Sequence, residues 1–141
     1  MHLARREFVE ALPDCDHAVA ENPDSAAALS NRGSLFLVTG EASKALADFE
    51  AALRLEPGDA ILHFNRGLAQ SSLDDREAAI AAYSEALRLD PDLAIAYHNR
   101  GYEYEVMGKR NEALSDYRRA LKINPELRPS IQALSRLRGD L

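Results

Sequence analysis

Side chains that could carry out catalysis or hold a metal ion are few in this sequence of 141 residues. His63 and His98 lie in two similar segments and could approach each other, but a catalytic or structural zinc site needs at least a third protein ligand. Packing or surface-lining imidazoles explain the pair more simply. Cys15 is the sole cysteine, so no intrachain disulfide can form. It falls at a helix-packing position, which predicts an inert buried thiol.

Motifs for nucleotide, metal and redox chemistry are missing. The sequence contains no GxGxxG, GxxxxGK[ST], HExxH or CxxC pattern. The carboxylates of Asp74, Asp75, Glu103 and Glu105 are typical of turns and solvated helix faces. We therefore expect no enzymatic activity, no metal site and no cofactor.

One polar group recurs with a fixed spacing. The tripeptide Asn-Arg-Gly occurs at 31–33, 65–67 and 99–101, so it repeats every 34 residues. A carboxamide offers both a hydrogen-bond donor and an acceptor, and a peptide backbone offers the same two groups. The role of these three carboxamides depends on the surface on which the fold places them.

The residues that follow each tripeptide also recur. Segments 44–57, 78–91 and 112–125 align without a gap at the same offset of 34 residues, and segment 10–23 is a fourth, partial copy. A fixed period of this length indicates an array of stacked structural units.

Each period reads as two helices joined by a short turn. Apolar and small residues recur three or four positions apart, as at Tyr97, Gly101 and Tyr104. A proline at 57, 91 and 125 disfavours the helical conformation of the residue before it, and so ends each unit. The predicted helices span 26–38, 43–56, 60–72, 76–90, 94–107 and 110–124.

The chain thus resembles the tetratricopeptide repeat (TPR) family. The family pattern of a large residue, Gly, an aromatic residue, Ala, an aromatic residue, Ala and Pro is matched in the third copy by Tyr97, Gly101, Tyr104, Ala113, Tyr117, Ala120 and Pro125. The second copy departs from it at His63 and Gln70. The resemblance implies an all-α fold, a right-handed α-solenoid of antiparallel helix pairs that forms a TPR superhelix.

The repeat divides the chain into five parts. We expect a partial N-terminal repeat or cap over 1–25, TPR 1 over 26–59, TPR 2 over 60–93, TPR 3 over 94–127, and a C-terminal capping helix over 128–141. In the first part only the second helix of a repeat has room, with Pro13 near its first turn and at most a short separate helix before it. The array either starts with a degenerate cap or is a piece of a longer protein.

The C-terminal part reads as one more amphipathic helix over 128–140. Ile131, Leu134 and Leu137 are expected to face the last repeat, while three arginines, Arg128, Arg136 and Arg138, face water. A polar outer side on a terminal unit keeps such an array soluble.

In the TPR family the first helix of each repeat lines a concave groove. The resemblance therefore implies that Asn31, Asn65 and Asn99 form a ladder on the inner wall, where they could hold the backbone of an extended partner segment. The alternative is that each Asn bonds a neighbouring helix and spaces the repeats. Both roles are compatible with the sequence.

The ladder alone is too weak for recognition. Three neutral hydrogen bonds contribute roughly 2–4 kcal/mol in total, whereas micromolar affinity requires about 8 kcal/mol. Apolar pockets must supply the remainder, and aromatic anchors commonly dominate such interfaces. The candidates are Phe64, Leu68, Tyr102, Leu37, Val38 and Val106, and His98 is expected to tune affinity as the pH falls towards its pKa.

The three arginines of the recurring tripeptide occupy a place that the family usually fills with Leu. We expect each to run its stem along the packed surface and pair with a carboxylate. Asp48 and Asp116 stand at the right place for Arg32 and Arg100. Ala82 stands there in the second repeat, so Arg66 needs another partner.

TPR modules that clamp the terminal carboxylate of chaperones use Lys and Arg side chains in the groove. Here Asn65 matches that pattern, but Ser30, Ser34, Ile95 and Asn99 stand at its other positions. We therefore expect a protein or peptide ligand that is not a chaperone C-terminal carboxylate.

The leading hypothesis is a protein–protein interaction module that binds a peptide in its concave groove. The alternative is a homodimer or assembly scaffold that uses apolar surface near Phe8, Leu12 and Val19. A net charge of −6 disfavours nucleic acid and anionic lipid, and no apolar run is long enough for a membrane span. The lone cysteine and the missing signal peptide fit the cytoplasm.

Overall fold

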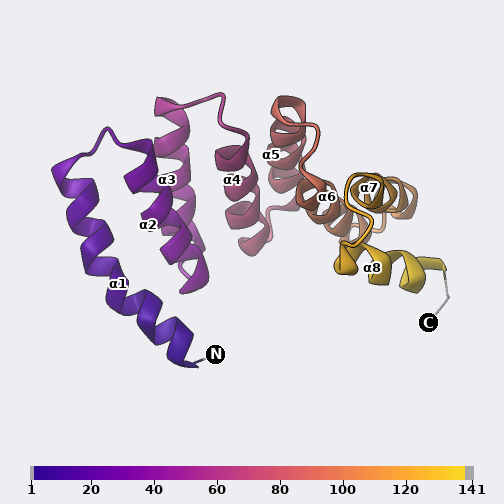
Figure 1. Cartoon of the computed structure of the whole chain (residues 1–141), viewed down its shortest axis with the longest axis horizontal. Coiled ribbons are helices and arrows are strands. Elements are labelled where there is room, and N and C mark those ends of the chain that lie inside the picture. The colour runs from indigo at the N-terminus through magenta and orange to yellow at the C-terminus, as the bar shows by residue number, and fades with distance from the viewer. Residues whose placement is uncertain (1, 139–141) are drawn as a thin grey trace.

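The computed structural model describes residues 2–138, and within them every regular element is an α-helix. The helices stand side by side along the long axis of the molecule, with α1 at one end and α8 at the other (Figure 1). Their bounds are α1 His2–Glu21, α2 Ala26–Val38, α3 Ala42–Leu55, α4 Ala60–Ser72, α5 Arg76–Leu89, α6 Ala94–Val106, α7 Arg110–Ile123 and α8 Arg128–Arg138.

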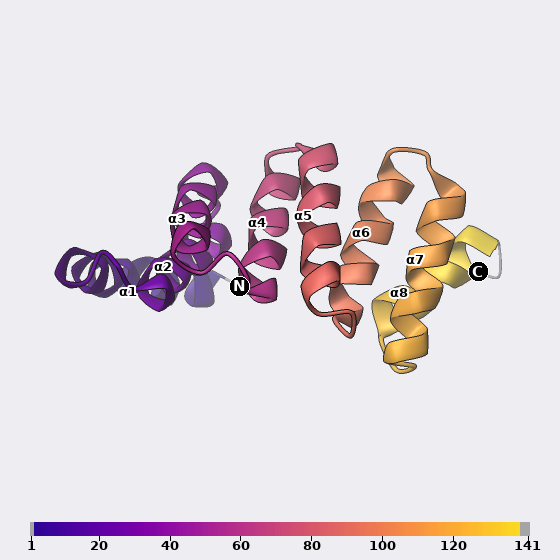
Figure 2. The same ribbon diagram turned by 90° about the horizontal axis from the view of Figure 1, so that it is seen from above.

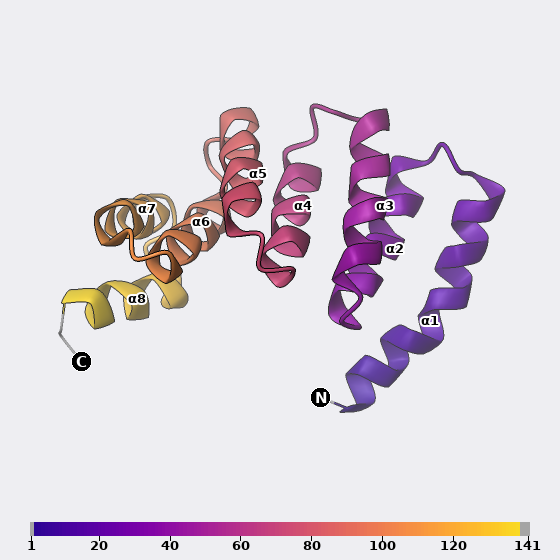
Figure 3. The same ribbon diagram turned by 180° about the vertical axis from the view of Figure 1, so that it is seen from behind.

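The helix pairs α2–α3, α4–α5 and α6–α7 form successive layers of an all-α solenoid. The direction of the helices turns steadily from layer to layer, so that α6 and α7 lie strongly inclined to α2 and α3 (Figures 2 and 3). The six helices predicted for these pairs are confirmed, and each observed end lies within one residue of the prediction. In addition to the pairs, α2 contacts α4 across the boundary between layers.

The N-terminal prediction was wrong in one respect. α1 is a single helix of 20 residues, and Pro13 lies in its interior and not near its start. The proline ring is exposed, so the helix loses the backbone hydrogen bond of this one residue without a steric conflict with the core. Leu12 and Val19 pack against the core on either side of the proline, which holds the continuous helix in place.

Close approach of a glycine to an aromatic ring sets the spacing within each helix pair. A Cβ atom added at Gly67 would lie 2.5 Å from a ring carbon of Tyr83, which is far inside van der Waals contact. The same contact distance is 2.8 Å between Gly33 and Phe49. The aromatic side chains are almost fully buried. Any side chain at the glycine would therefore force the two helices apart.

Arginine–aspartate pairs close two of the three repeats. Arg32 Nε and Nη2 donate to the two carboxylate oxygens of Asp48, both at 2.8 Å, and Arg100 forms the same fork with Asp116, also at 2.8 Å. Both aspartates are buried, and the hydrogen bonds to them raise the pKa of each arginine. The pairing predicted from the sequence is confirmed.

The second repeat lacks this pair, as predicted. Ala82 replaces the aspartate, and Arg66 Nη2 lies instead 3.3 Å from His63 Nδ1. The other nitrogen of His63 lies 2.8 Å from the carbonyl oxygen of Pro57. That nitrogen must carry the proton, so Nδ1 accepts from Arg66. The Nε atom of Arg66 and the side-chain oxygen of Gln70 are buried without a partner.

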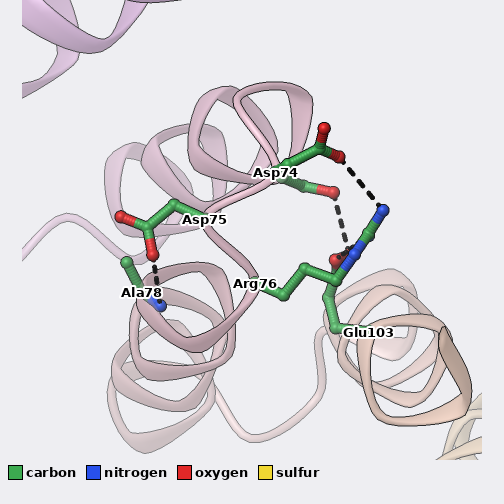
Figure 4. Close-up of polar contacts among 6 residues, drawn as sticks. Asp74, Asp75, Arg76, Ala78 and Glu103 are labelled. Atoms are coloured by element: carbon green, nitrogen blue, oxygen red, sulfur yellow. Dashed lines mark hydrogen bonds and ion pairs between the residues drawn. The ribbon is translucent and has the colours of Figure 1, made fainter. Parts of the chain in front are cut away.

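A buried carboxylate ties the second repeat to the third. Glu103 was expected on a solvated face, but only 1% of it is exposed. It accepts a hydrogen bond from Arg76 Nη1 at 2.7 Å (Figure 4). It accepts a second one from Ser71 Oγ at 2.8 Å. Arg76 also reaches Asp74, as Figure 4 shows. We call this group, Glu103 with Arg76 and Ser71, the clasp. Because its members come from α6, α5 and α4, it fixes the angle between the two repeats.

The turn before the clasp has an unusual backbone. Asp74 has φ of 59°, whereas the equivalent turns of the other two repeats have glycine, with φ of 86° at Gly40 and 78° at Gly108. Aspartate is one of the few residues that tolerates this left-handed region. Asp75 then caps α5 by accepting from the backbone N–H of Ala78 (Figure 4).

The C-terminal helix packs on α7 with Leu134 and Leu137, as predicted, and its three arginines are exposed. Ser130, Ala133 and Leu134 are buried and Leu137 is partly buried. Ile131 was predicted to face the last repeat, but it is 42% exposed.

We predict that Asp116→Ala lowers the free energy of unfolding by about 3–5 kcal/mol, because it leaves the guanidinium of Arg100 buried without its carboxylate. Urea denaturation monitored by circular dichroism measures the change. The double variant Arg100→Leu/Asp116→Ala should regain most of the loss, since it removes both charges and restores the Leu typical of the family. A loss in the single variant below about 1 kcal/mol would contradict the structural weight given to the pair.

Candidate functional site

One side of the first helices α2, α4 and α6 forms the candidate site, and we call it the first-helix surface. All of its positions are exposed or partly buried, and none is fully buried. The positions are Ala27, Ser30, Asn31, Ser34, Leu37, Val38, Ile61, Phe64, Asn65, Leu68, Ser71, Ser72, Ile95, His98, Asn99, Tyr102, Glu105 and Val106.

Large apolar side chains are exposed along this surface. Tyr102 is 48% exposed, and Val38 and Val106 at the ends of α2 and α6 are exposed to a similar degree. Ile61 and Ile95 are also exposed, although they were missing from the predicted apolar set. Both stand one residue after the start of their helix, and that shared register was the available signal. Exposed apolar side chains gathered on one surface are typical of binding sites.

Four predicted site residues have structural contacts as well. Leu37 packs against the core of the first repeat. The ring of Phe64 lies 5.6 Å from that of Tyr83, and His98 makes the equivalent contact with the next aromatic ring at 5.2 Å. Leu68 is partly buried. These four side chains are the partly buried, apolar or aromatic part of the surface, which we call its floor, and the residues named before them are its exposed part.

The three Asn side chains differ in their surroundings. Asn31 is exposed, whereas Asn65 and Asn99 are partly buried. Asn99 forms a side-chain hydrogen bond with the hydroxyl of Tyr83 on α5, and burial raises the pKa of that phenol despite this bond. Phe49 occupies the equivalent place for Asn65 and offers no hydroxyl. Asn99 therefore bonds a neighbouring helix, while Asn65 has no such acceptor.

Charged and titratable groups gather at the C-terminal end of the surface. Glu105 accepts hydrogen bonds from Arg136 at 2.6 Å and from the hydroxyl of Tyr117 at 2.7 Å. Burial is the largest single effect on the pKa of Glu105, and it raises this pKa. The two hydrogen bonds together with the charge of Arg136 outweigh burial and hold the pKa below its usual value. This group could not be predicted from the repeat pattern, because the partner Arg136 comes from the helix beyond the last repeat.

His98 is held beside this group. Its Nδ1 lies 2.8 Å from the hydroxyl of Ser130, which is fully buried on α8. Burial lowers the pKa of His98 and the nearby charge of Arg136 lowers it further, while Glu105 raises it. The imidazole is therefore neutral at pH 7.

A shallow pocket of about 260 Å³ opens between the N-terminal ends of α2 and α4. It combines apolar groups with the carboxamide of Asn31 and the carboxylates of Glu56 and Asp59. Asp59 already caps α4 by accepting from the backbone N–H groups of Ile61 and Leu62. The pocket can hold one side chain of a ligand.

The described residues contain no group of three or more His, Cys, Asp or Glu side chains arranged for a metal ion. The thiol of Cys15 is partly buried, and burial together with Asp14 and Asp16 raises its pKa, so it is protonated at neutral pH. Among the same residues, no helix has the length and apolar character that a bilayer crossing requires.

Three family models match the chain. Models described as tetratricopeptide repeat match residues 2–59 and 94–127, and a model described as TPR repeat matches residues 72–108. No curated protein sequence matches the chain.

Solved structures of TPR proteins share this fold. The crystal structure of MamA superposes with a TM-score of 0.87 at 22% identity, over 97% of this chain and 80% of MamA. The TPR domain of Arabidopsis OM64 gives a TM-score of 0.79 at 25% identity, over 82% of this chain and 96% of that domain. The first TPR of Spaghetti (RPAP3), bound to the HSP90 peptide SRMEEVD, gives 0.78 at 23% identity, over 82% and 91% of the two chains.

The surroundings of the Asn side chains lead to a stability prediction. Asn99→Ala should lower the free energy of unfolding by about 1 kcal/mol, because it removes the hydrogen bond to Tyr83. Asn65→Ala, the matched control, should change it by less than about 0.5 kcal/mol. Urea denaturation of both variants provides the comparison. Equal losses would show that Asn99 has no special structural role.

The pKa of His98 provides a second prediction. Nuclear magnetic resonance titration, with His98→Gln used to assign the signal, should give a pKa below the usual 6.5. Arg136→Gln should raise it by removing a nearby positive charge. Because the unfolded chain binds the proton more readily, stability should fall as the pH decreases below about 6.5, and His98→Gln should remove that part of the fall. A pKa that Arg136→Gln leaves unchanged would contradict this account.

Proposed function

Because the chain belongs to the tetratricopeptide repeat family, we propose that its first-helix surface binds an extended segment of a partner protein. The observation that carries the proposal is the exposure of Val38, Ile61, Ile95, Tyr102 and Val106 along this surface. The contact between α2 and α4 supports a concave shape here, because helices on the inner side of a curved array approach each other. The role is binding, without a catalytic step.

Apolar contacts provide most of the affinity in this proposal. Burial of apolar surface is worth about 25 cal/mol per Å², and a buried aromatic anchor often contributes 2 kcal/mol or more to an interface. Tyr102 is the strongest anchor, because it is large, exposed and near the middle of α6. Phe64, Leu68 and Leu37 form the apolar floor beneath the ligand, and His98 adds a neutral imidazole at neutral pH.

The Asn side chains hold the ligand backbone. Asn31 and Asn65 are the main candidates, because Asn99 already bonds Tyr83. A carboxamide can donate to a ligand carbonyl and accept from a ligand N–H regardless of the ligand side chains. The ladder therefore sets the path of the segment, and the apolar anchors select its sequence.

The expected ligand is apolar and does not end in a clamped carboxylate. The first-helix surface has no Lys or Arg among its positions on α2, α4 and α6. Arg136, contributed by α8, is already bonded to Glu105. A buried carboxylate without a cation is strongly disfavoured. This chain should therefore not bind an acidic segment such as the peptide held by RPAP3.

The second candidate function is self-assembly through the N-terminal edge. Phe8 and Val9 are exposed on α1, which favours it. Leu12 and Val19, which we had placed on the same apolar edge, pack against the core of the first repeat instead. The apolar patch on α1 is thus smaller than predicted, and the peptide-binding function remains the leading proposal.

Selection from a library of random displayed peptides, followed by fluorescence anisotropy with the selected peptides, tests the proposal. The selected peptides should be rich in large apolar residues. Tyr102→Ala should weaken their binding about tenfold or more, because it removes an anchor worth about 2 kcal/mol. The peptide SRMEEVD serves as the negative control and should not bind.

Leu73→Ala is the matched control variant. Leu73 is an exposed apolar residue directly after α4 and is not part of the first-helix surface. It should leave peptide affinity unchanged. Equal effects of the two variants, or selected peptides rich in acidic residues, would overturn the proposed function.

A further inference from the structure

The two end helices occupy complementary places in the 34-residue repeat. The first helices begin at Ala26, Ala60 and Ala94, and α8 begins at Arg128, one further period along. α1 ends at Glu21, which is one period before the end of α3 at Leu55. By register, α8 is therefore a first helix and α1 is a second helix. Within the described residues, neither packs against the other half of its own repeat.

Within residues 2–138, no second helix of its own repeat covers α8. Ile131 stands at the place that Leu29, His63 and Tyr97 occupy in complete repeats. Leu29 is 6% exposed, His63 is 8% exposed and Tyr97 is partly buried, whereas Ile131 is 42% exposed. An apolar residue at a core position of the repeat thus lies open at the C-terminal end of the array.

Within the same described residues, no first helix of its own repeat covers α1. Ala18 stands at the place of Ala52, Ala86 and Ala120, which are all fully buried, yet Ala18 is exposed. Cys15 stands at the place of the buried aromatic rings and is only partly buried. The face of α1 that would pack on a first helix is therefore open at the N-terminal end.

The two open faces can pack without a steric clash. In complete repeats a glycine on the first helix meets an aromatic ring on the second, as Gly101 meets Tyr117. At the ends of this chain the same two places hold Ser135 on α8 and Cys15 on α1. The larger residue on the first helix faces a smaller one on the second. The total volume of this pair is below that of a glycine and an aromatic residue, so the pair fits the same space without overpacking.

The two ends also carry opposite charge. Residues 2–24 have six exposed carboxylates, namely Glu7, Glu10, Asp14, Asp16, Glu21 and Asp24, against two basic residues, Arg5 and Arg6, of which Arg6 pairs with Glu10. Segment 109–138 has three carboxylates, of which Asp116 is buried in its pair with Arg100. Its eight basic residues are Lys109, Arg110, Arg118, Arg119, Lys122, Arg128, Arg136 and Arg138. Oppositely charged surfaces attract each other and orient the encounter of two partners.

We infer that the partner of both end faces is a second copy of this chain. The α8 helix of one copy packs against α1 of the next, and together they complete a hybrid repeat in which Ile131 and Ala18 become buried. The contact is head to tail, so each copy retains one open face of each kind and the assembly grows as a continuous solenoid. The inference does not depend on the proposed peptide-binding function, because it uses the ends of the array and leaves the first-helix surface open.

Disulfide trapping tests the register of the hybrid repeat. The variant Ser135→Cys keeps the native Cys15, so oxidation with copper–phenanthroline should link position 135 of one copy to Cys15 of the next. Non-reducing electrophoresis should then show a ladder of trimers and longer species. Cys15→Ser/Ser135→Cys and the unmodified chain each have one thiol, so they can give dimers at most. Absence of species longer than dimers in the two-thiol variant would overturn the inference.

One-sided variants test the polarity of the contact. Ile131→Asp blocks the α8 face and Ala18→Arg blocks the α1 face. Both positions are exposed, so both variants should keep the circular dichroism spectrum of the parent chain. In multi-angle light scattering the parent should gain mass with concentration and lose it at high salt. Each variant alone should be monomeric, and an equal mixture should form a 1:1 dimer through the two intact faces.

Ile95→Asp is the matched control, because it places the same charge on the first-helix surface. It should leave assembly intact, whereas loss of assembly in this variant would mean that copies dock in the groove. A parent chain that stays monomeric at all concentrations overturns the inference, as does a mixture of the two one-sided variants that stays monomeric. Binding of the basic end to anionic lipid vesicles without self-association would also overturn it.

Discussion

The close contact between a glycine and an aromatic ring is the constraint on which the rest of this structure depends. It brings the two helices of each repeat together at Gly33, Gly67 and Gly101, and it recurs every 34 residues. The identical spacing makes successive layers alike, so they stack into a solenoid instead of closing into a globule. The same stacking places equivalent positions of α2, α4 and α6 on one surface. The proposed peptide site and the open faces at the two ends are both consequences of this one packing distance.

Polar interactions vary this regular scaffold from repeat to repeat. The guanidinium forks of Arg32 and Arg100 close the outer repeats, while Arg66 in the middle repeat is left with a single long contact to His63. A buried polar group without a partner lowers the free energy of unfolding, whereas an exposed ion pair changes it little. The middle repeat should therefore be less stable than its neighbours. The repeats are therefore alike in shape but differ in stability.

Much of the fold could be predicted from the sequence because the same local pattern occurs three times, once in each repeat. The helix ends, the turns and the pairing of Arg32 and Arg100 with aspartates all follow from residues at fixed offsets. Features that occur once were predicted poorly. Pro13 gave a misleading helix start, since a proline ring can be tolerated on an exposed helix face. The burial of Glu103 and its bond to Arg76 depend on contacts across a repeat boundary. Ile61 and Ile95 stand at groove positions by register, but they were left out of the predicted apolar anchors, and their exposure shows that they belong with them.

The clasp has no counterpart at the other joint between repeats, because Ala42 and Ala69 stand at the places of Arg76 and Glu103. Joints held by directional bonds resist bending, whereas joints held by apolar packing alone slide more easily. The joint between the second and third repeats is then stiffer than the joint between the first and second. A segment that lies across both joints would meet a preformed surface on α4 and α6, and would draw α2 towards itself by bending the softer joint.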